Sequence, residues 1–521
     1  MASLVLGIDV GTTSTKVVLA DPAAGVVAQA SESVALSSPH PGWAEADPAQ
    51  WWANLSALVP AVLAAASEAT GRPVTADDIA AVATTGMVPA VIPVDEAGRP
   101  LRNAILQNDA RATAEIRELA AALPDLDFVA RTGSALTQQS VGPTLLWLAR
   151  HEPDAWAGAA TVQGSYDWLA SRLGAAPHVE RNWALESGLF ELEPGGALTP
   201  LHPVREALAG LAGIKPEVVP TVADPGTVIG AVSPPAAAET GLRAGTPIVV
   251  GGADHVLSAY AAGLASPGDW LVKLGGAGDI LVVSGYPLVD ERLYLDAHPV
   301  AGLWLPNGCM ATSGSLIRWF QSVSGSASNP APVADLEAEA ITAAPAELIC
   351  LPYFLGEKSP LHDPDLRGAF LGLHLGHTRG DMYRAILEGI AYGFRHHAEI
   401  FSERNVALRP TARVSNGGSR SLVWKQILAD ALGVALEPVL DHPGAALGAA
   451  LSAAVGKDAS GAPAPQAWAA AAGVPGMVTI GPPIEPDPAH AERYAEAYRI
   501  YREAGAALTP ISHQLARRSM P

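Results

Sequence analysis

The first twenty residues alternate between apolar runs and a short polar turn. Residues 4–10 and 14–20 are mostly apolar, and Gly11, Thr12 and Thr13 lie between them. This pattern predicts two strands joined by a tight turn. Gly11 can take φ > 0 and bring its backbone close to a ligand, and the N–H groups of such a turn can form an anion site. On this stretch alone, an ordinary hairpin with a polar turn is an equally good interpretation.

Asp9 is the one carboxylate at the end of the first predicted strand. Mg²⁺ in proteins is commonly held by one or two carboxylates together with substrate phosphates. A carboxylate beside an anion-binding turn is therefore a candidate magnesium ligand, either directly or through water.

Strands and helices alternate along the next hundred residues. Strands are predicted at 26–30 and 79–84, and helices at 51–66 and 112–123. The first of these helices has Asp47 and Pro48 at its start, which is typical of a helix N-terminus. Alternation of this kind indicates an α/β fold class.

A second strand–turn–strand unit occupies residues 270–283, with Gly275 and Gly276 in its turn. It copies the first hairpin about 265 residues later, which predicts a duplicated architecture with one hairpin per domain and a ligand cleft between the domains. A chain of 521 residues is also too long for a single core. We predict domains at 1–251 and 252–521.

Asp254 follows an apolar strand at 247–250 and the pair Gly251 and Gly252. A helix is predicted at 255–264, so Asp254 lies near a helix N-terminus, where the macrodipole favours its ionised form. An ionised carboxylate there could accept the proton of an attacking hydroxyl. The alternative from this segment alone is a helix N-cap, a position that Asp favours.

Gly417 and Gly418 join an apolar strand to a helix predicted at 423–432. Glycines at such a junction let a flat ligand lie against the backbone, although a turn with a serine cap is locally as good an interpretation. The small-residue helix at 444–450 suits close packing. A surface excursion is predicted at 456–475 and an amphipathic final helix at 485–508.

Composition narrows the classes of partner. The chain has 32 Lys and Arg against 52 Asp and Glu, for a formal net charge of −20. This balance argues against nucleic acid or an anionic membrane as a partner, but not against a nucleotide bound by backbone N–H groups and Mg²⁺. With 49% hydrophobic residues, no membrane-length apolar run and only two cysteines, a cytoplasmic protein is expected. The sequence leaves a homodimer open.

Taken in order, these segments resemble the FGGY family of carbohydrate kinases over residues 4–508. The most specific part of the resemblance is the string at 352–373, which begins Pro-Tyr-Phe-Leu-Gly-Glu-Lys-Ser-Pro and continues through 377–391. Gly251–Asp254 resembles the family's catalytic segment, and Gly417–Gly418 resembles its adenosine-binding glycines.

The resemblance implies two actin-like (ribonuclease H-like) ATPase domains that close on ATP, Mg²⁺ and a sugar. It makes Asp254 the catalytic base and Asp9 the magnesium-binding residue. The residues that it implies for ATP binding are Gly11, Thr12, Thr13, Lys16, Gly275, Gly276, Gly417, Gly418 and Ser421.

Within the family the chain looks closest to xylulokinase-like members, which implies a ketopentose such as D-xylulose as substrate. The positions implied for the sugar are Met87, Val88, Gln107, Asn108, Asp109, Asp254 and His255. Several depart from the usual xylulokinase pattern: Val88 replaces a His, Gln107 a Trp and His255 an Asn. Another pentulose, a polyol such as glycerol or a sugar acid such as gluconate therefore stays open as substrate. A non-catalytic actin-like nucleotide-binding protein is the alternative outside the kinases.

Overall fold

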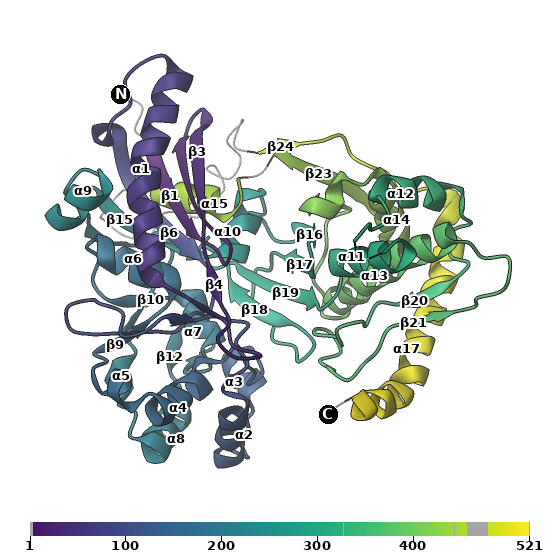
Figure 1. The fold of residues 1–521 in the computed structure, drawn as a ribbon, viewed down its shortest axis with the longest axis horizontal. Helices are drawn as coiled ribbons and strands as arrows, with labels where there is room; N and C mark the ends of the chain where they lie inside the picture. The colour runs from purple at the N-terminus through teal and green to yellow at the C-terminus, as the bar shows by residue number, and fades with distance from the viewer. Residues whose placement is uncertain (1–3, 327, 442, 456–477, 520–521) are drawn as a thin grey trace.

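The computed structural model describes residues 4–326, 328–441, 443–455 and 478–519, and Figure 1 shows two lobes built around separate sheets. The predicted excursion at 456–475 lies outside the described residues. None of the helices in these ranges is both long and apolar enough to cross a membrane.

The first sheet has six strands in the order β14-β15-β6-β1-β2-β3. Strands β1 (Leu4–Val10), β2 (Ser14–Asp21) and β3 (Gly25–Ser33) form the predicted antiparallel meander. Strand β6 (Ile79–Gly86) runs parallel to β1, and β15 (Pro247–Ala253) runs parallel to β6. Strand β14 (Val228–Ala231) closes the edge, antiparallel to β15.

Side chains of β1 point alternately to the two faces of this sheet, and both faces are covered by helices. Leu6 and Ile8 share a core with Trp51 of α1 (Pro48–Thr70), which begins at the predicted Asp47 cap. Val5 belongs to a separate core with α10 (Asp254–Ala261) and α15 (Ala445–Val455). A strand buried on both faces explains its almost continuous apolar sequence.

The second sheet repeats the layout of the first. Its order is β18-β19-β17-β16-β22-β23-β24. Strands β16 (Trp270–Leu274) and β17 (Gly278–Val282) form the predicted second hairpin, and β19 (Trp304–Met310) and β18 (Tyr294–Ala297) extend it. Strands β22 (Thr411–Ser415) and β23 (Ala435–Asp441) add in parallel to β16, and β24 (Thr479–Ile480) pairs with β23.

Helices α11 (Gly314–Ser324), α12 (Val333–Thr342), α13 (Arg379–Glu403) and α14 (Leu422–Leu432) belong to the second lobe (Figure 1). The final helix, α17, spans Ala491–Ser519 and differs from the predicted range of 485–508. Pro486 and Pro488 lack the N–H donors of a helix interior. Residues 485–487 are therefore irregular, and Pro488–His490 form a short 3-10 turn before the helix begins.

The predicted division after residue 251 falls within strand β15. Helix α10 follows that strand and packs with α15 on the first sheet, although both helices come after the division. The first lobe is therefore built from residues 4–261 together with α15.

The remaining elements are shorter and lie around the two sheets. The helices are α2 (Thr113–Ala122), α3 (Phe128–Thr132), α4 (Val141–His151), α5 (Pro153–Ala157), α6 (Ser165–Leu173), α7 (Arg181–Glu186), α8 (His202–Ala212) and α9 (Pro234–Thr240). The strands are β4 (Leu36–Ser37), β5 (Glu45–Ala46), β7 (Ile92–Val94), β8 (Ala104–Ile105), β9 (Thr161–Gln163), β10 (His178–Glu180), β11 (Phe190–Leu192), β12 (Leu198–Pro200), β13 (Thr221–Ala223), β20 (Ile349–Leu351) and β21 (Ala369–Leu371).

Candidate active site

A cavity of about 250 Å³ lies where elements of the two lobes meet. The first lobe contributes the segments after β6 and β8, the end of α7 and the start of α10. The second lobe contributes β17, β18, β19 and the loop after β20. The residues that line it include Val88, Gln107, Glu186, Asp254, His255, Asp279, Asp296, Asn307 and Lys358.

Asp254 is the first residue of α10, and Ala253 holds the cap position before it. The structure therefore does not support the N-cap alternative for Asp254. Its side chain is 38% exposed and lines the cavity. The carboxylate is thus free of helix capping and open to a ligand, which is the arrangement that a general base requires.

His255 connects Asp254 to a second carboxylate. Its Nε2 lies 2.7 Å from Oδ2 of Asp296, and its Nδ1 lies 3.5 Å from Oδ1 of Asp254. Burial lowers the pKa of His255, but the charge of Asp296 and the hydrogen bond to Asp254 outweigh burial and hold that pKa well above its ordinary value. The raised pKa favours the protonated imidazolium form of His255, which lies between the two carboxylates.

Asp9 lies at the end of β1, within electrostatic reach of Asp254. Burial and the charge of Asp254 raise the pKa of Asp9 to about 8, and Lys16 partly offsets this. Its Oδ1 is buried and has no hydrogen-bond partner among the described residues. A divalent cation would satisfy this oxygen and relieve the repulsion between the two carboxylates, so the residues present fit Mg²⁺.

The turn after Asp9 differs from the prediction in one respect. Gly11 has no positive φ, and its N–H donates to the carbonyl of Ser14 at 2.9 Å. A Cβ at Gly11 would lie 3.2 Å from that same carbonyl oxygen, so the tight turn itself accounts for the glycine. Thr12 and Thr13 complete the turn between β1 and β2. Lys16 donates through Nζ to the carbonyl of Pro443 at 3.1 Å, which ties the hairpin to the segment before α15.

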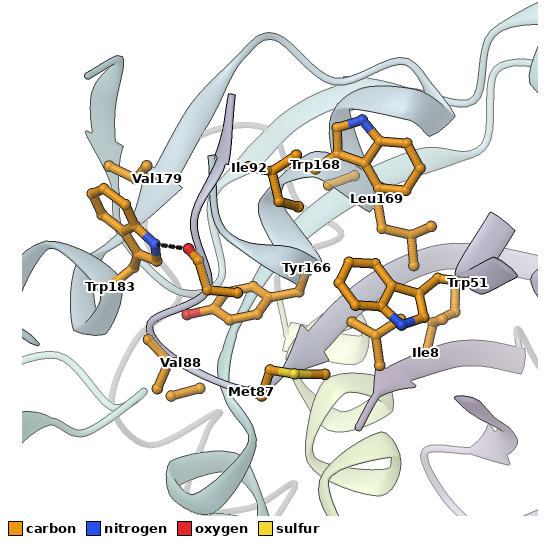
Figure 2. Packing of buried hydrophobic residues seen from close by; sticks show 14 of the residues in the cluster. Ile8, Trp51, Met87, Val88, Ile92, Tyr166, Trp168, Leu169, Val179 and Trp183 are labelled. Atoms are coloured by element: carbon orange, nitrogen blue, oxygen red, sulfur yellow. Dashed lines mark hydrogen bonds between the residues drawn. The ribbon is translucent and has the colours of Figure 1, made fainter. Parts of the chain in front are cut away.

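Of the positions implied for the sugar, the cavity brings together Val88, Gln107, Asp254 and His255. Met87 is 1% exposed and packs in the first core, as Figure 2 shows beside Ile8 and Tyr166. Val88 belongs to the same core and also lines the cavity.

Asn108 and Asp109 follow Gln107 but do not line the cavity. Asn108 is exposed. Asp109 is buried, and its Oδ1 and Oδ2 accept hydrogen bonds from the Arg111 guanidinium at 2.8 and 2.7 Å, while Oδ2 also accepts from the Ala44 amide. The Arg111 guanidinium also lies over the ring of Trp43. The Asp109 carboxylate is therefore already paired with Arg111 in a buried ion pair.

A second cavity, of about 560 Å³, gathers the nucleotide residues predicted in the second lobe. Gly275, Gly276, Gly417, Gly418 and Ser421 all line it. A Cβ at Gly417 would meet nothing within 4 Å, whereas one at Gly418 would lie 2.3 Å from the ring of Trp424. Ser421 caps α14 by accepting a hydrogen bond from the Trp424 amide. The serine-cap interpretation is therefore correct, and Ser421 lines the cavity as well.

Sequence reasoning missed several residues that line the two cavities. Glu186, Asp296 and Lys358 line the first, and Arg318 of α11 lines the second beside Gly276. Asp296 left one usable signal, because a carboxylate inside an apolar strand needs a partner. Glu186 and Arg318 occur in ordinary helix patterns, which carry no such signal.

Comparison with known proteins agrees with this geometry. The model of the FGGY carbohydrate kinase N-terminal domain matches residues 4–261, and that of the C-terminal domain matches residues 283–456. The chain is 28% identical over 451 residues to a xylulose kinase of Escherichia coli, covering 86% of this chain and 88% of that protein. It is 29% identical over 463 residues to the L-xylulose/3-keto-L-gulonate kinase of the same organism, covering 87% and 88%.

A solved structure titled xylulose kinase, from Rhodospirillum rubrum, is also similar. It is 42% identical and superposes with a TM-score of 0.85, covering 98% of this chain and 100% of that one. Two similar α/β lobes with a ligand cavity between them define the actin-like ATPase fold. The chain belongs to the FGGY family of carbohydrate kinases and is an ATP-dependent sugar kinase.

Proposed function

We propose that this kinase transfers the γ-phosphoryl group of ATP to a hydroxyl of a ketopentose such as D-xylulose. Asp254 orients the hydroxyl and accepts its proton as the oxygen attacks phosphorus. The observation that carries this proposal is that the Asp254 carboxylate does not cap α10 and lines the cavity together with His255 and Gln107. The relatives named xylulose kinase support the substrate class.

Nucleotide binding divides between the lobes in this proposal. Gly417 and Gly418 lie against the adenosine, and the turns at Gly11–Thr13 and Gly275–Gly276 bind the phosphates. Asp9 holds Mg²⁺, which when bound neutralises charge on the phosphates. Arg318 supplies a further cation beside Gly276. The need for ATP supports a cytoplasmic reaction.

Catalysis then depends mainly on position and charge. Phosphoryl transfer requires alignment of the attacking oxygen, the phosphorus and the leaving oxygen, together with stabilisation of charge on the transferred group. Asp254 aligns the attacking oxygen, and the two glycine turns help to stabilise the charge on the transferred group. Closure of the lobes on both substrates would exclude water and suppress hydrolysis of ATP.

Val88 distinguishes this site from a typical xylulokinase. It offers no hydrogen bond where such enzymes usually have a His, so we expect D-xylulose to be accepted with reduced discrimination against epimers and reduced analogues. Steady-state kinetics on D-xylulose, D-ribulose, L-ribulose and the matching polyols tests this. A preference for D-xylulose above about a thousandfold, or roughly 4 kcal/mol, would contradict the relaxed site. Absence of turnover with every pentulose would contradict the substrate class.

A sugar acid is the second candidate substrate, because one relative carries 3-keto-L-gulonate in its name. The two candidates differ in charge, and the charges that line the cavity bear on the choice.

A further inference from the structure

We propose that Glu186 and Asp296 are specificity-determining residues that accept hydrogen bonds from hydroxyls of an uncharged sugar and disfavour sugar acids. The inference rests on the proposed function, since it concerns the substrate of the same site. Glu186 ends α7 of the first lobe and Asp296 lies on β18 of the second, so the pair spans the cavity between the lobes.

Asp296 is only 2% exposed and is held through one of its two oxygens. Its Oδ2 lies 2.7 Å from Nε2 of His255 and accepts a hydrogen bond from Nδ2 of Asn307, also at 2.7 Å. Its Oδ1 is buried and has no partner among the described residues. The carboxylate is therefore fixed in position with one acceptor unused.

The same cavity contains two more unused acceptors. Oε1 of Glu186 and Oε1 of Gln107 are both buried and lack a hydrogen-bond partner in the described part of the chain. A buried acceptor without a donor is unfavourable, and three in one cavity call for a ligand that brings several donors. Hydroxyl groups of a sugar are such donors, whereas an ionised carboxylate has none.

The charges that line the cavity also oppose an anionic ligand. Glu186, Asp254, Asp279 and Asp296 are its acidic groups, and His255 and Lys358 are its cationic ones. His255 is already committed to Asp296 and Asp254. Lys358 is exposed on the loop after β20, and among the described lining residues the acidic groups outnumber the cationic ones by four to two. Burial and the charge of Asp296 raise the pKa of Glu186 well above its ordinary value, so the like charge that a sugar acid would face there comes from Asp254 and Asp296.

A metal ion is the other ligand that Glu186, His255 and Asp296 could hold, because their ligand atoms lie within 4.8 Å of one another. Neither ring nitrogen of His255 is available for this, since one contacts Asp296 and the other faces Asp254. An imidazolium has no lone pair to offer a metal. Sugar hydroxyls are therefore the better occupant.

The experiment measures both binding and turnover for wild type, Glu186→Gln, Asp296→Asn and a control, Glu206→Gln. Glu206 is an exposed carboxylate on α8, so its variant carries the same charge change away from the cavity. The ligands are D-xylulose, its deoxy analogues that each lack one hydroxyl, and D-xylonate. Binding is measured by titration calorimetry without ATP, and turnover by release of ADP.

We expect wild type to favour D-xylulose over D-xylonate at least 100-fold in both measurements. Glu186→Gln and Asp296→Asn should each weaken D-xylulose binding 10- to 100-fold, or about 1.4 to 2.8 kcal/mol, with KM for ATP and the Glu206→Gln control unchanged. For each variant, one deoxy analogue should bind as it does to wild type, because the contact is already missing. A purely structural role would weaken every analogue equally.

Equal binding of D-xylonate and D-xylulose would overturn the inference, and so would variants that bind D-xylulose as tightly as wild type. Tight binding of Mg²⁺, Mn²⁺ or Zn²⁺ without nucleotide, lost in Glu186→Gln, would also overturn it in favour of a metal site. Selective sugar binding without any release of ADP would leave the inference standing and contradict the proposed phosphoryl transfer.

Discussion

Asp9 lies near the end of β1 and Asp254 begins α10 directly after β15, and the charge of Asp254 affects the ionisation of Asp9. The charge of Asp254 helps to raise the pKa of Asp9 to about 8, so without a cation the Asp9 carboxyl is largely protonated at neutral pH. Binding of Mg²⁺ at Asp9 would require the loss of that proton.

Asp9→Ala tests this role. We expect the variant to need more Mg²⁺ for ATP use and to lose at least 10-fold in kcat/KM for ATP, because its buried cation ligand is gone. Affinity for the sugar should change less than threefold. Steady-state kinetics with Mg²⁺ varied, beside Glu32→Ala as an exposed control on β3, measures both. A fall in sugar affinity with no response to Mg²⁺ would show that the assignment is wrong.

Local pattern predicts the place of a single residue in the fold well when that place depends on its sequence neighbours. Asp9 lies near the end of the apolar strand β1 and Asp254 directly follows β15, as their sequence neighbours indicate. Asp109 also follows a strand, but its environment depends on Ala44 and Arg111, which approach it only in the folded chain. Nothing near Asp109 in the sequence indicates that its carboxylate is already paired.

At the scale of elements, the junction between β22 and α14 places two adjacent glycines in different surroundings. Gly417 faces open space in the nucleotide cavity, whereas Gly418 packs against Trp424 and Leu274. Substitutions at these two neighbouring positions can therefore test the predicted nucleotide contact separately from packing.

We expect Gly417→Val to weaken ATP binding at least 10-fold with little change in melting temperature, because its side chain occupies space meant for the nucleotide. Gly418→Val should lower the melting temperature as well, since its Cβ alone would lie 2.3 Å from the Trp424 ring. Calorimetric ATP binding and thermal unfolding of both variants provide the comparison. Equal loss of stability in both would support a purely structural turn.

The elements that sequence predicted best are those whose pattern is local. The two glycine-turn hairpins and the Asp47 cap of α1 agree with expectation, because turns and caps depend on neighbouring residues. The final helix was misplaced at both ends. The helix continues to Ser519 through an internal proline, Pro510, and proline is unfavourable inside a helix because it lacks an N–H donor.

At the scale of the whole molecule, α15 links distant parts of the chain. It lies after residue 440 but packs between β1 and α10 of the first lobe (Figure 1). The two helix backbones approach closely at Gly448, where a Cβ would lie 2.2 Å from the carbonyl oxygen of Leu257. Sequence predicted that this small-residue helix packs closely, but not against which lobe.

Gly448→Ala should therefore destabilise the protein by about 1–3 kcal/mol or more, because neither backbone can yield without separating α15 from α10. Gly210→Ala on α8 is the matched control, since a Cβ there meets nothing within 4 Å and alanine favours a helix. Urea unfolding of both variants compares the free energies of unfolding. An unchanged value for Gly448→Ala would mean that the two helices are not in this close contact.

The account depends most on Asp254 as the base that accepts the proton of the sugar hydroxyl between the closed lobes. The most direct test is the rate of D-xylulose phosphorylation by Asp254→Asn, with ATP affinity measured on the same preparation. We expect kcat to fall by about 10²- to 10⁴-fold while ATP binds as in wild type, because the base is lost and the nucleotide site is intact. Turnover within about threefold of wild type would contradict the mechanism.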